Sequence, residues 1–286
     1  MTARARLVPY WLILPAWVWL GLLFIVPLVF MLSVSLMTGD LISGFTLTWH
    51  ISTYAAAISQ YHTQLLRSLL YGASATAITL AVSYPVAYFI AVRGGRHKSS
   101  VLFLLLLPFF VSFVIRTQQW SFLLADDGLL IQPFKDIGLL PGNFHVLATP
   151  WAVIGGLAYN SVPFMVMPIY VALERIDGRL IEAATDLFAS RRQAVARVVV
   201  PLSLPGVFAG CLLTFVPAAS DYVNASILGG PGTTMIGNII QTEYFTNSDY
   251  PTAAALSFVL MIVLLAGVLL YARALGTDEV LQGATL

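Results

Sequence analysis

Long apolar runs, separated by short polar segments, dominate the 286-residue sequence. A helix needs about 20 mostly apolar residues to cross a hydrocarbon layer roughly 30 Å thick. Several runs are long enough, and we expect each to form one membrane-spanning helix. They are residues 12–36, 69–92, 101–124, 151–173, 198–220 and 253–271. Prolines lie inside five of these six runs, so we expect several of the spans to be kinked.

The composition supports the same class of protein. Hydrophobic residues make up 59% of the chain and charged residues only 9%, whereas a soluble domain is about 25% charged. We therefore predict an all-α integral membrane protein, with residues 1–286 forming a single transmembrane domain and no separate soluble domain. The formal net charge of +1 provides no basic face for phosphates, so nucleic acid is not an expected partner.

The positions of the basic residues predict the orientation in the membrane, because Lys and Arg are enriched in cytoplasmic segments. If the N-terminus is cytoplasmic, eleven of the fourteen basic residues lie inside. They are Arg4, Arg6, Arg93, Arg96, Lys98, Arg175, Arg179, Arg191, Arg192, Arg197 and Arg273. Both termini and the segment 174–200 should then face the cytoplasm. The outer segments are 37–67, 125–150 and 229–252, and the first should contain a short interfacial helix in WHISTYAAAISQYHTQLL.

The segment 174–200, named here the 174–200 hairpin, is amphipathic and charged although its flanks are apolar. At helical spacing, one face collects apolar residues, namely Leu180, Ile181, Ala184, Leu187 and Phe188. Glu182, Thr185 and Asp186 lie mainly on the other face. A second amphipathic piece, 191–200, leads to Pro201 and Pro205, which open the fifth span. The pattern predicts a surface helix-turn-helix bonded to a spanning helix; an ordinary solvated hairpin fits it equally well.

Glu182, Ala183 and Ala184 are followed at fixed spacing by Phe188, Val198, Val200 and Pro201. This resembles the EAA motif of bacterial ABC-importer permeases: Glu-Ala-Ala, three residues, Gly, nine residues, Ile, one residue, Leu-Pro. The resemblance implies the type I permease fold with six spans, in which cytosolic coupling helices dock in a groove of a separate ATPase. The residues it assigns to this docking are Glu182, Ala183, Ala184, Asp186, Phe188 and Pro201.

Phe188 departs from the family pattern, which has glycine at that position. Glycine adopts a positive φ without steric cost, whereas a bulky aromatic residue there is disfavoured. Two explanations follow: the turn has a different shape, or the aromatic ring itself inserts into the ATPase groove.

Two outer stretches resemble the spermidine/putrescine branch of the family. They are VIRTQQWSFLLADDGLL at residues 114–130 and the segment 218–255. Branches that carry iron, thiamine or amino-phosphonates have similar stretches, so these solutes are alternatives to a polyamine. The resemblance implies a bacterial inner-membrane complex, with membrane lipid around it. Its other members would be a cytosolic ATPase dimer, a second and different permease subunit, and an extracytoplasmic solute-binding protein.

The chain lacks the motifs of a catalyst. No G-x-x-x-x-G-K-[ST] sequence surrounds either lysine, so ATP and Mg should be bound by the partner ATPase and no cofactor by this chain. The rival class, an integral membrane enzyme, needs H-E-x-x-H or paired intramembrane aspartates, and neither occurs. A passive channel would leave the 174–200 hairpin without a purpose. Cys211 is the single cysteine and the four histidines are scattered, so neither a disulfide nor a metal site is expected.

Polar groups at membrane depth are costly and often mark a pathway. Asp221 lies sixteen residues beyond Pro205, which places it roughly 24 Å along the fifth span, near the outer mouth. A carboxylate with neighbouring aromatic faces suits a polycationic amine. The candidate path residues are Asp221, Tyr222, Glu243, Tyr244 and Asn160. A solvated helix end is an equal explanation for Asp221. Arg116 would repel a polyamine, so we expect it to pair with a carboxylate or to reach the interface.

Overall fold

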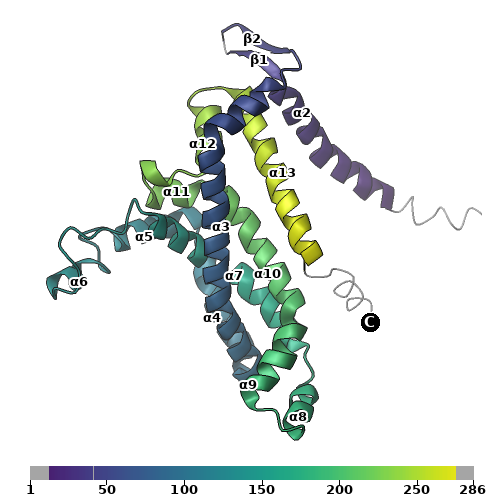
Figure 1. Ribbon diagram of the computed structural model, residues 1–286, viewed down its shortest axis with the longest axis vertical. Coiled ribbons are helices and arrows are strands. Elements are labelled where there is room, and N and C mark those ends of the chain that lie inside the picture. The colour runs from purple at the N-terminus through teal and green to yellow at the C-terminus, as the bar shows by residue number, and fades with distance from the viewer. Residues whose placement is uncertain (1–12, 41, 275–286) are drawn as a thin grey trace, which may run out of the picture. The chain divides into compact units, whose positions relative to one another are not determined.

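The computed structural model describes residues 13–40 and 42–274 (Figure 1). Five of its helices are long and apolar enough to cross a membrane: Ile13–Ser35, Ser52–Arg93, Pro150–Glu174, Arg191–Ser220 and Tyr250–Arg273. A bent pair, Gly95–Phe110 with Phe113–Leu123, makes a sixth span if it is counted as one. The predicted six-span helical fold is thus confirmed for the part of the chain that the structure describes. Residue 12 and both chain ends lie outside it.

The third span is broken, a sharper change of direction than the kinks expected of the proline-containing runs. α4 (Lys98–Leu106) continues into a 3-10 turn, η3 (Leu107–Phe110), and α5 (Phe113–Leu123) then leaves at 86°. Val111 and Ser112 between them are extended, with ψ of 142° and 135°. Pro108, which lacks a backbone N–H, sits in the 3-10 turn that precedes these extended residues, so the helical hydrogen-bond ladder ends here.

The first outer segment also differs from the prediction. Its expected interfacial helix is the first part of α3 (Ser52–Arg93), a continuous helix of 42 residues that includes Pro85. A β-hairpin of β1 (Met37–Asp40) and β2 (Gly44–Leu47) was not predicted; the two strands pair antiparallel with Met37 opposite Leu47. At its tip, Asp40 Oδ1 accepts hydrogen bonds from the backbone N–H groups of Ile42 and Ser43.

The chain forms two compact units. Unit 1 comprises residues 1–62 and 239–262, and unit 2 comprises residues 63–238 and 263–286. Unit 1 contains the π-turn η1 (Gly21–Ile25), α2 (Val26–Ser35), the β-hairpin and the first part of α3. The hydroxyl groups of Ser35 and Tyr54, 2.7 Å apart, connect α2 to α3 within this unit.

Unit 2 is organised around α7 (Pro150–Glu174) and α10 (Val200–Ser220), with the remainder of α3 beside them. One apolar cluster consists of Ala75, Val153, Ile154, Leu157, Ala158, Ala218, Ala225 and Met235. A second consists of Ala87, Met165, Val166, Ile169, Leu173 and Val199. Hydroxyl groups join the helices between these clusters: Thr79 donates to the Ala158 carbonyl at 3.2 Å, and Tyr84 lies 2.9 Å from the Ser203 hydroxyl.

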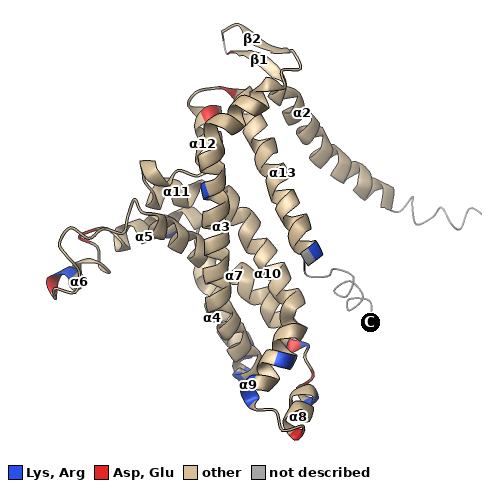
Figure 2. Ribbon diagram, in the orientation of Figure 1, with Lys and Arg blue, Asp and Glu red and all other residues tan. Residues whose placement is uncertain are grey.

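The other helical elements are short. They are η2 (Gly95–His97), α6 (Gln132–Asp136), α8 (Gly178–Asp186), α9 (Arg191–Ala194), η4 (Val195–Val199), α11 (Val223–Leu228), η5 (Pro231–Thr233) and α12 (Ile236–Phe245). α13 (Tyr250–Ala274) is the last long helix. Figure 2 shows that most Lys and Arg positions of unit 2 lie along the ribbon at the end that carries α8 and α9. The 174–200 hairpin therefore lies at the charged end of unit 2, beyond the apolar part of its spanning helices.

Candidate functional site

The 174–200 hairpin consists of two capped helices joined by a four-residue turn. α8 begins where the Asp177 carboxylate accepts a hydrogen bond from Arg179 N at 3.0 Å. α9 begins with a capping box, in which Ser190 Oγ accepts from Gln193 N at 3.3 Å and Gln193 Oε1 accepts from Ser190 N at 2.8 Å. Such caps satisfy N–H groups that have no partner inside their helix. The sequence thus defines both helix starts locally.

The hairpin is bonded directly to the fifth span, as its sequence predicted. α9 continues through the π-turn η4 into α10, so that residues Arg191–Ser220 form one candidate span. Isolated π-turns inside α-helices occur frequently at functional sites. Ile181 of α8 packs against the apolar cluster that contains Val199. The hairpin is therefore connected to α10 both by the continuous backbone and by side-chain packing near its start.

The predicted apolar face of α8 is divided. Ile181 faces the protein, but Leu187 and Phe188 are 80% and 97% exposed. The helix ends at Asp186, so helical spacing no longer decides where the next two side chains point. The residues predicted to dock on an ATPase are accessible: Glu182, Ala183, Asp186, Phe188 and Pro201 are all exposed, and Ala184 is half-buried.

Phe188 adopts the backbone conformation that glycine usually provides. Its φ is +61°, in the left-handed region. The first explanation for its departure from the family pattern, a turn of different shape, is therefore wrong. An aromatic side chain here occupies a glycine-type position, at a conformational cost of order 1–3 kcal/mol.

Where α7 ends, Glu174 forms an ion pair with Lys98 of α4, with Nζ and Oε1 2.8 Å apart. Glu174 is the last residue of α7. The pair lies beside a pocket of about 250 Å³ that Gly178 and Ile181 of α8 also line. This ion pair joins the start of α4 to the end of α7, next to the 174–200 hairpin.

Asp221 ends α10 and belongs to the start of α11. Its Oδ1 accepts a hydrogen bond from Asn224 N at 2.7 Å, and its backbone is extended with ψ 135°. Burial raises the pKa of the Asp221 carboxyl, although hydrogen bonds from the Asn224 and Val223 backbone act in the opposite direction. Tyr222 beside it is 45% exposed. Asp221 thus lies at a helix end, as one of its two explanations required, but it is partly buried; its place on a solute path stays a prediction.

Asn160 lies in a buried polar cluster and is only 5% exposed. Its Nδ2 donates to Thr117 Oγ1 at 3.1 Å and to Asn224 Oδ1 at 3.2 Å. Thr117 and Asn224 are fully buried, so three side chains from α5, α7 and α11 meet here. Asn160 Oδ1 and Asn224 Nδ2 have no hydrogen-bond partner among the described residues. In this conformation Asn160 connects helices, and its predicted contact with a solute stays a prediction.

Glu243 and Tyr244 lie in unit 1, and their side chains have different surroundings. Glu243 is buried, and both carboxylate oxygens are occupied: Tyr61 Oη donates to Oε1 at 2.7 Å and Asn247 Nδ2 donates to Oε2 at 2.9 Å. Tyr244 is half exposed and packs with the rings of Phe245 and Tyr250, with centroids 4.9 and 5.0 Å away. Both predicted acidic path residues therefore have hydrogen-bond partners within their own part of the chain, and their contact with a solute stays a prediction.

Arg116 does not pair with a carboxylate among the described residues, contrary to one of its two expected roles. Its guanidinium lies over the rings of Phe109 and Tyr159, at 4.3 and 6.0 Å from their centroids. Trp120 contacts Tyr159 edge-on at 5.2 Å. A cation over aromatic faces is attracted to the ring quadrupole, more strongly where water is excluded. The aromatic rings thus stabilise a charge that has no acidic partner.

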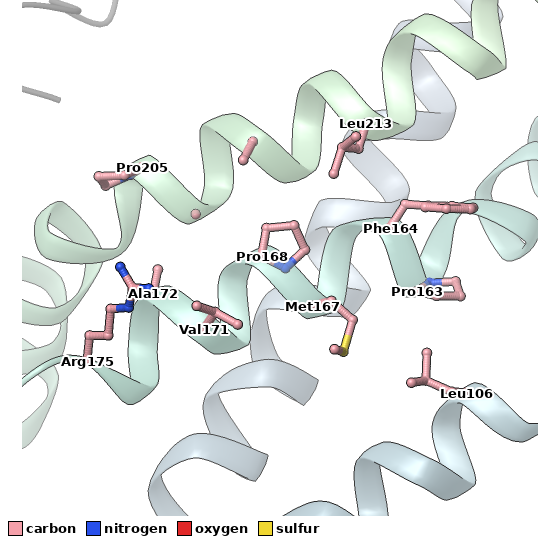
Figure 3. Close-up of a pocket in the computed structure, with 12 residues that line it drawn as sticks. Leu106, Pro163, Phe164, Met167, Pro168, Val171, Ala172, Arg175, Pro205 and Leu213 are labelled. Carbon is pink, nitrogen blue, oxygen red and sulfur yellow. The ribbon is translucent and has the colours of Figure 1, made fainter. Parts of the chain in front are cut away.

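An apolar groove of about 600 Å³ lies along α7 and α10 (Figure 3). Pro163, Pro168 and Val171 line one wall, and Pro205 and Leu213 line the other. Arg175, at one end, is the single charged residue of the lining. The groove offers no acidic group for a cation, and no cluster of three or more His, Cys, Asp or Glu that could hold a metal occurs in the described ranges.

Known proteins resemble this chain in sequence and in fold. The model of the family "Binding-protein-dependent transport system inner membrane component" matches residues 83–275. The spermidine/putrescine transport system permease protein PotB of Salmonella typhimurium (strain LT2) is 35% identical over 257 residues, covering 90% of each chain. PotB of Escherichia coli (strain K12) is also 35% identical over 257 residues, covering 90% of this chain and 94% of the relative. The chain belongs to this family of transport permeases.

A solved structure supports the family fold. It is that of a bacterial ABC transporter involved in the import of the acidic polysaccharide alginate. The superposition has a TM-score of 0.73 and covers 95% of this permease and 96% of the other chain, at 18% identity. The resemblance that the sequence motifs suggested is confirmed, and with it the type I ABC-importer permease fold. The permease is a non-catalytic, multi-pass component of the inner membrane.

The sequence analysis did not predict the structural roles of several residues of the permease. Gly206 and Gly210 form a G-x-x-x-G pair in α10, a pattern that lets helices approach closely in membranes. A Cβ at residue 210 would lie 2.7 Å from Met165 Sδ. Thr117 and Asn224, the partners of Asn160, are polar residues in or beside apolar runs, and that signal could have identified them. The role of Tyr61 could not be recognised in the sequence, because only folding brings it next to Glu243.

Proposed function

We propose that this permease forms half of the translocation pathway of an ATP-driven importer for polyamines such as spermidine or putrescine. Its partners would be a cytosolic ATPase dimer, a second permease subunit of related but different sequence, and an extracytoplasmic solute-binding protein. ATP and Mg would be bound by the ATPase, and no cofactor by this chain. The observation that carries the proposal is the capped α8–α9 hairpin, bonded without interruption to α10.

The orientation follows from the basic residues. Most of those in unit 2 gather at the α8–α9 end (Figure 2), and cytoplasmic segments of membrane proteins carry an excess of Lys and Arg. The hairpin would therefore face the cytoplasm, where nucleotide is available. Both chain termini would face the same side, since the chain crosses the membrane six times.

The hairpin would couple ATP hydrolysis to the movement of α10. Closure of the ATPase dimer would displace α8, and Ile181 and the continuous backbone through η4 would carry this displacement to α10. Tilting of α10 would open the pathway outward to receive solute, and release after hydrolysis would return it to the inward-open form. Two conformations that the ATPase binds with different affinity are sufficient for such coupling.

The cargo proposal rests on the relatives and on the chemistry at the outer end of α10. Two relatives at 35% identity are named as spermidine/putrescine permeases. Asp221, with the exposed ring of Tyr222 next to it, offers a carboxylate and an aromatic face to an ammonium group. The apolar groove along α7 and α10 contains no acidic residue, so a polyamine would not be held tightly as it moves inward.

Reconstituted transport tests the proposal. The permease would be co-expressed with the second permease, ATPase and binding protein encoded beside it, and the complex placed in proteoliposomes. We expect uptake of radiolabelled putrescine or spermidine that requires both ATP and the binding protein. Thiamine, ferric iron and an amino-phosphonate should not compete. Uptake without ATP would contradict the importer, whereas ATP-dependent uptake of one of the competitors would contradict only the cargo.

A further inference from the structure

The turn that ends α8 is a Schellman motif built around Phe188. Phe188 N donates to the Thr185 carbonyl at 3.0 Å, and Ala189 N donates to the Ala184 carbonyl at 3.0 Å. These are the two hydrogen bonds that define the motif. In it, the residue that follows the helix C-cap, here Phe188, adopts a left-handed conformation. Phe188 has φ +61°, and glycine is the usual residue here because it has no Cβ.

Phe188 is unfavourable in this chain for two independent reasons. Its backbone is in a region that bulky side chains rarely adopt. Its side chain is 97% exposed, so the ring gains almost no burial from the residues that the structure describes, and Leu187 beside it is 80% exposed. Strained residues persist mainly where function uses them. Glycine would form the same turn without either cost, so neither folding nor burial among the described residues explains the ring.

The surroundings of Phe188 match the centre of a protein interface. Charged residues of both signs flank it, with Glu182 and Asp186 on α8 and Arg191 and Arg192 on α9, all exposed. An apolar anchor inside a charged, solvated rim is the usual arrangement of a binding hot spot. A membrane surface is a poorer match, because helices that bind anionic lipid carry mainly Lys and Arg on their polar face, whereas α8 carries two acidic residues and one basic residue.

We propose that Phe188, with Leu187 beside it, inserts into an apolar pocket of the partner ATPase and selects the ATPase that has such a pocket. This inference rests on the proposed function, because it requires the hairpin to dock on an ATPase. The ring protrudes from a turn that is closed at both ends by hydrogen bonds, so little conformational entropy is lost when it is buried. An ATPase with a pocket too small for the ring would be rejected by steric clash.

Replacing Phe188 by glycine separates folding from docking, because the two effects have opposite signs. F188G removes the strained backbone and should leave the thermal stability of the purified permease complex unchanged or raise it. It also removes the ring, and we expect its Kd for the purified cognate ATPase to rise at least tenfold, measured by biolayer interferometry in nanodiscs. F188A retains a Cβ in the left-handed region but lacks the ring, and should weaken binding equally.

Ala148 provides a matched control. It has φ +62° and lies in the segment between α6 and α7, far along the chain from the hairpin. A148G relieves the same kind of strain, so its affinity for the ATPase should match that of the wild type. Affinity of F188G within twofold of the wild type would overturn the inference. Loss of binding in F188G but not in F188A would also overturn it, because the turn and not the ring would then be responsible.

A role in membrane attachment gives a different result. In that case F188G would bind the ATPase normally in detergent, while α8 would become more accessible to protease in nanodiscs, and the docking inference would fail. If the wild-type complex binds no ATPase at all, the proposed function fails instead. The two failures are therefore distinguishable by the wild-type measurement alone.

Discussion

Gly206 of α10 lies directly against the backbone of Pro168 in α7. A Cβ at residue 206 would come within 2.6 Å of the Pro168 carbonyl oxygen and 2.5 Å of the Ala172 Cβ. Contacts this short do not occur, so the two helices can adopt this distance only because residue 206 is glycine. The groove in Figure 3 runs along this same pair of helices.

We expect Gly206→Ala to destabilise unit 2, because α7 and α10 must move apart to accommodate the methyl group. Overpacking of a tight interface costs about 1–3 kcal/mol. The variant should show a lower melting temperature in detergent, measured by tryptophan fluorescence. Gly155→Ala is the control: Gly155 lies on α7 with nothing within 4 Å of its would-be Cβ, so its melting temperature should not fall. Equal stability of both variants would refute close packing at Gly206.

Glu182→Lys should uncouple transport from ATP hydrolysis. Glu182 is exposed on α8 and makes no side-chain hydrogen bond or ion pair within the described part of the chain, so folding and membrane insertion should be unaffected. Reversal of its charge at a docking surface should reduce putrescine uptake while the complex continues to hydrolyse ATP. Uptake and ATPase rates in the same proteoliposomes measure this. Normal ATP-dependent uptake would remove Glu182 from the coupling surface.

Asp221→Asn should reduce polyamine uptake without affecting assembly. Asparagine can still accept the hydrogen bond from Asn224 N, so the start of α11 is preserved and only the negative charge is lost. Labelled-putrescine uptake at equal membrane abundance is the measurement. Unchanged uptake would exclude Asp221 from the pathway and leave it a capping residue.

The pH dependence of uptake should also report on Asp221. Because burial raises the pKa of this carboxyl, it becomes neutral at a higher pH than a free aspartate as the medium is acidified. Uptake should therefore decline on acidification earlier than a normal aspartate would predict, and this part of the pH profile should be absent in Asp221→Asn. Identical profiles for both proteins would assign the decline to another group.

Asn160→Leu should destabilise the protein, because it removes two donated hydrogen bonds and leaves Thr117 and Asn224 buried with fewer partners. An unsatisfied buried polar group costs about 1–3 kcal/mol. Thermal unfolding measures this loss, and uptake at matched folded protein measures any role in the path. Reduced uptake with full stability would favour the path role over the connecting role.

Several elements could be predicted from the sequence because their causes are local. An apolar run of about 20 residues has few ways to satisfy its backbone except as a spanning helix. The two hairpin helices were predicted from their apolar spacing, and the caps at Asp177, Ser190 and Gln193, which were not predicted, are also made between residues no more than three apart. The 86° break in the third span and the continuity of α3 from Ser52 to Arg93 were not predicted, because hydropathy alone does not report extended residues or helix continuity.

Candidate path residues could not be placed in the same way. Glu243 appeared available to a cation, but Tyr61 and Asn247 occupy both of its oxygens. Arg116 needed a counter-charge by simple electrostatics, yet aromatic rings stabilise it. In each case the deciding partner is a residue whose pairing the sequence does not report.

The sequence by itself determined the six apolar spans, their orientation bias and the capped hairpin, because hydrophobic burial, charge distribution and helix capping act over a few neighbouring residues. The tertiary structure decided which polar side chains are paired inside the protein, how closely Gly206 brings α10 to α7, and that Phe188 projects outward in a left-handed turn. These depend on contacts between residues far apart in the chain, and on the exact path of the backbone, which no local pattern encodes.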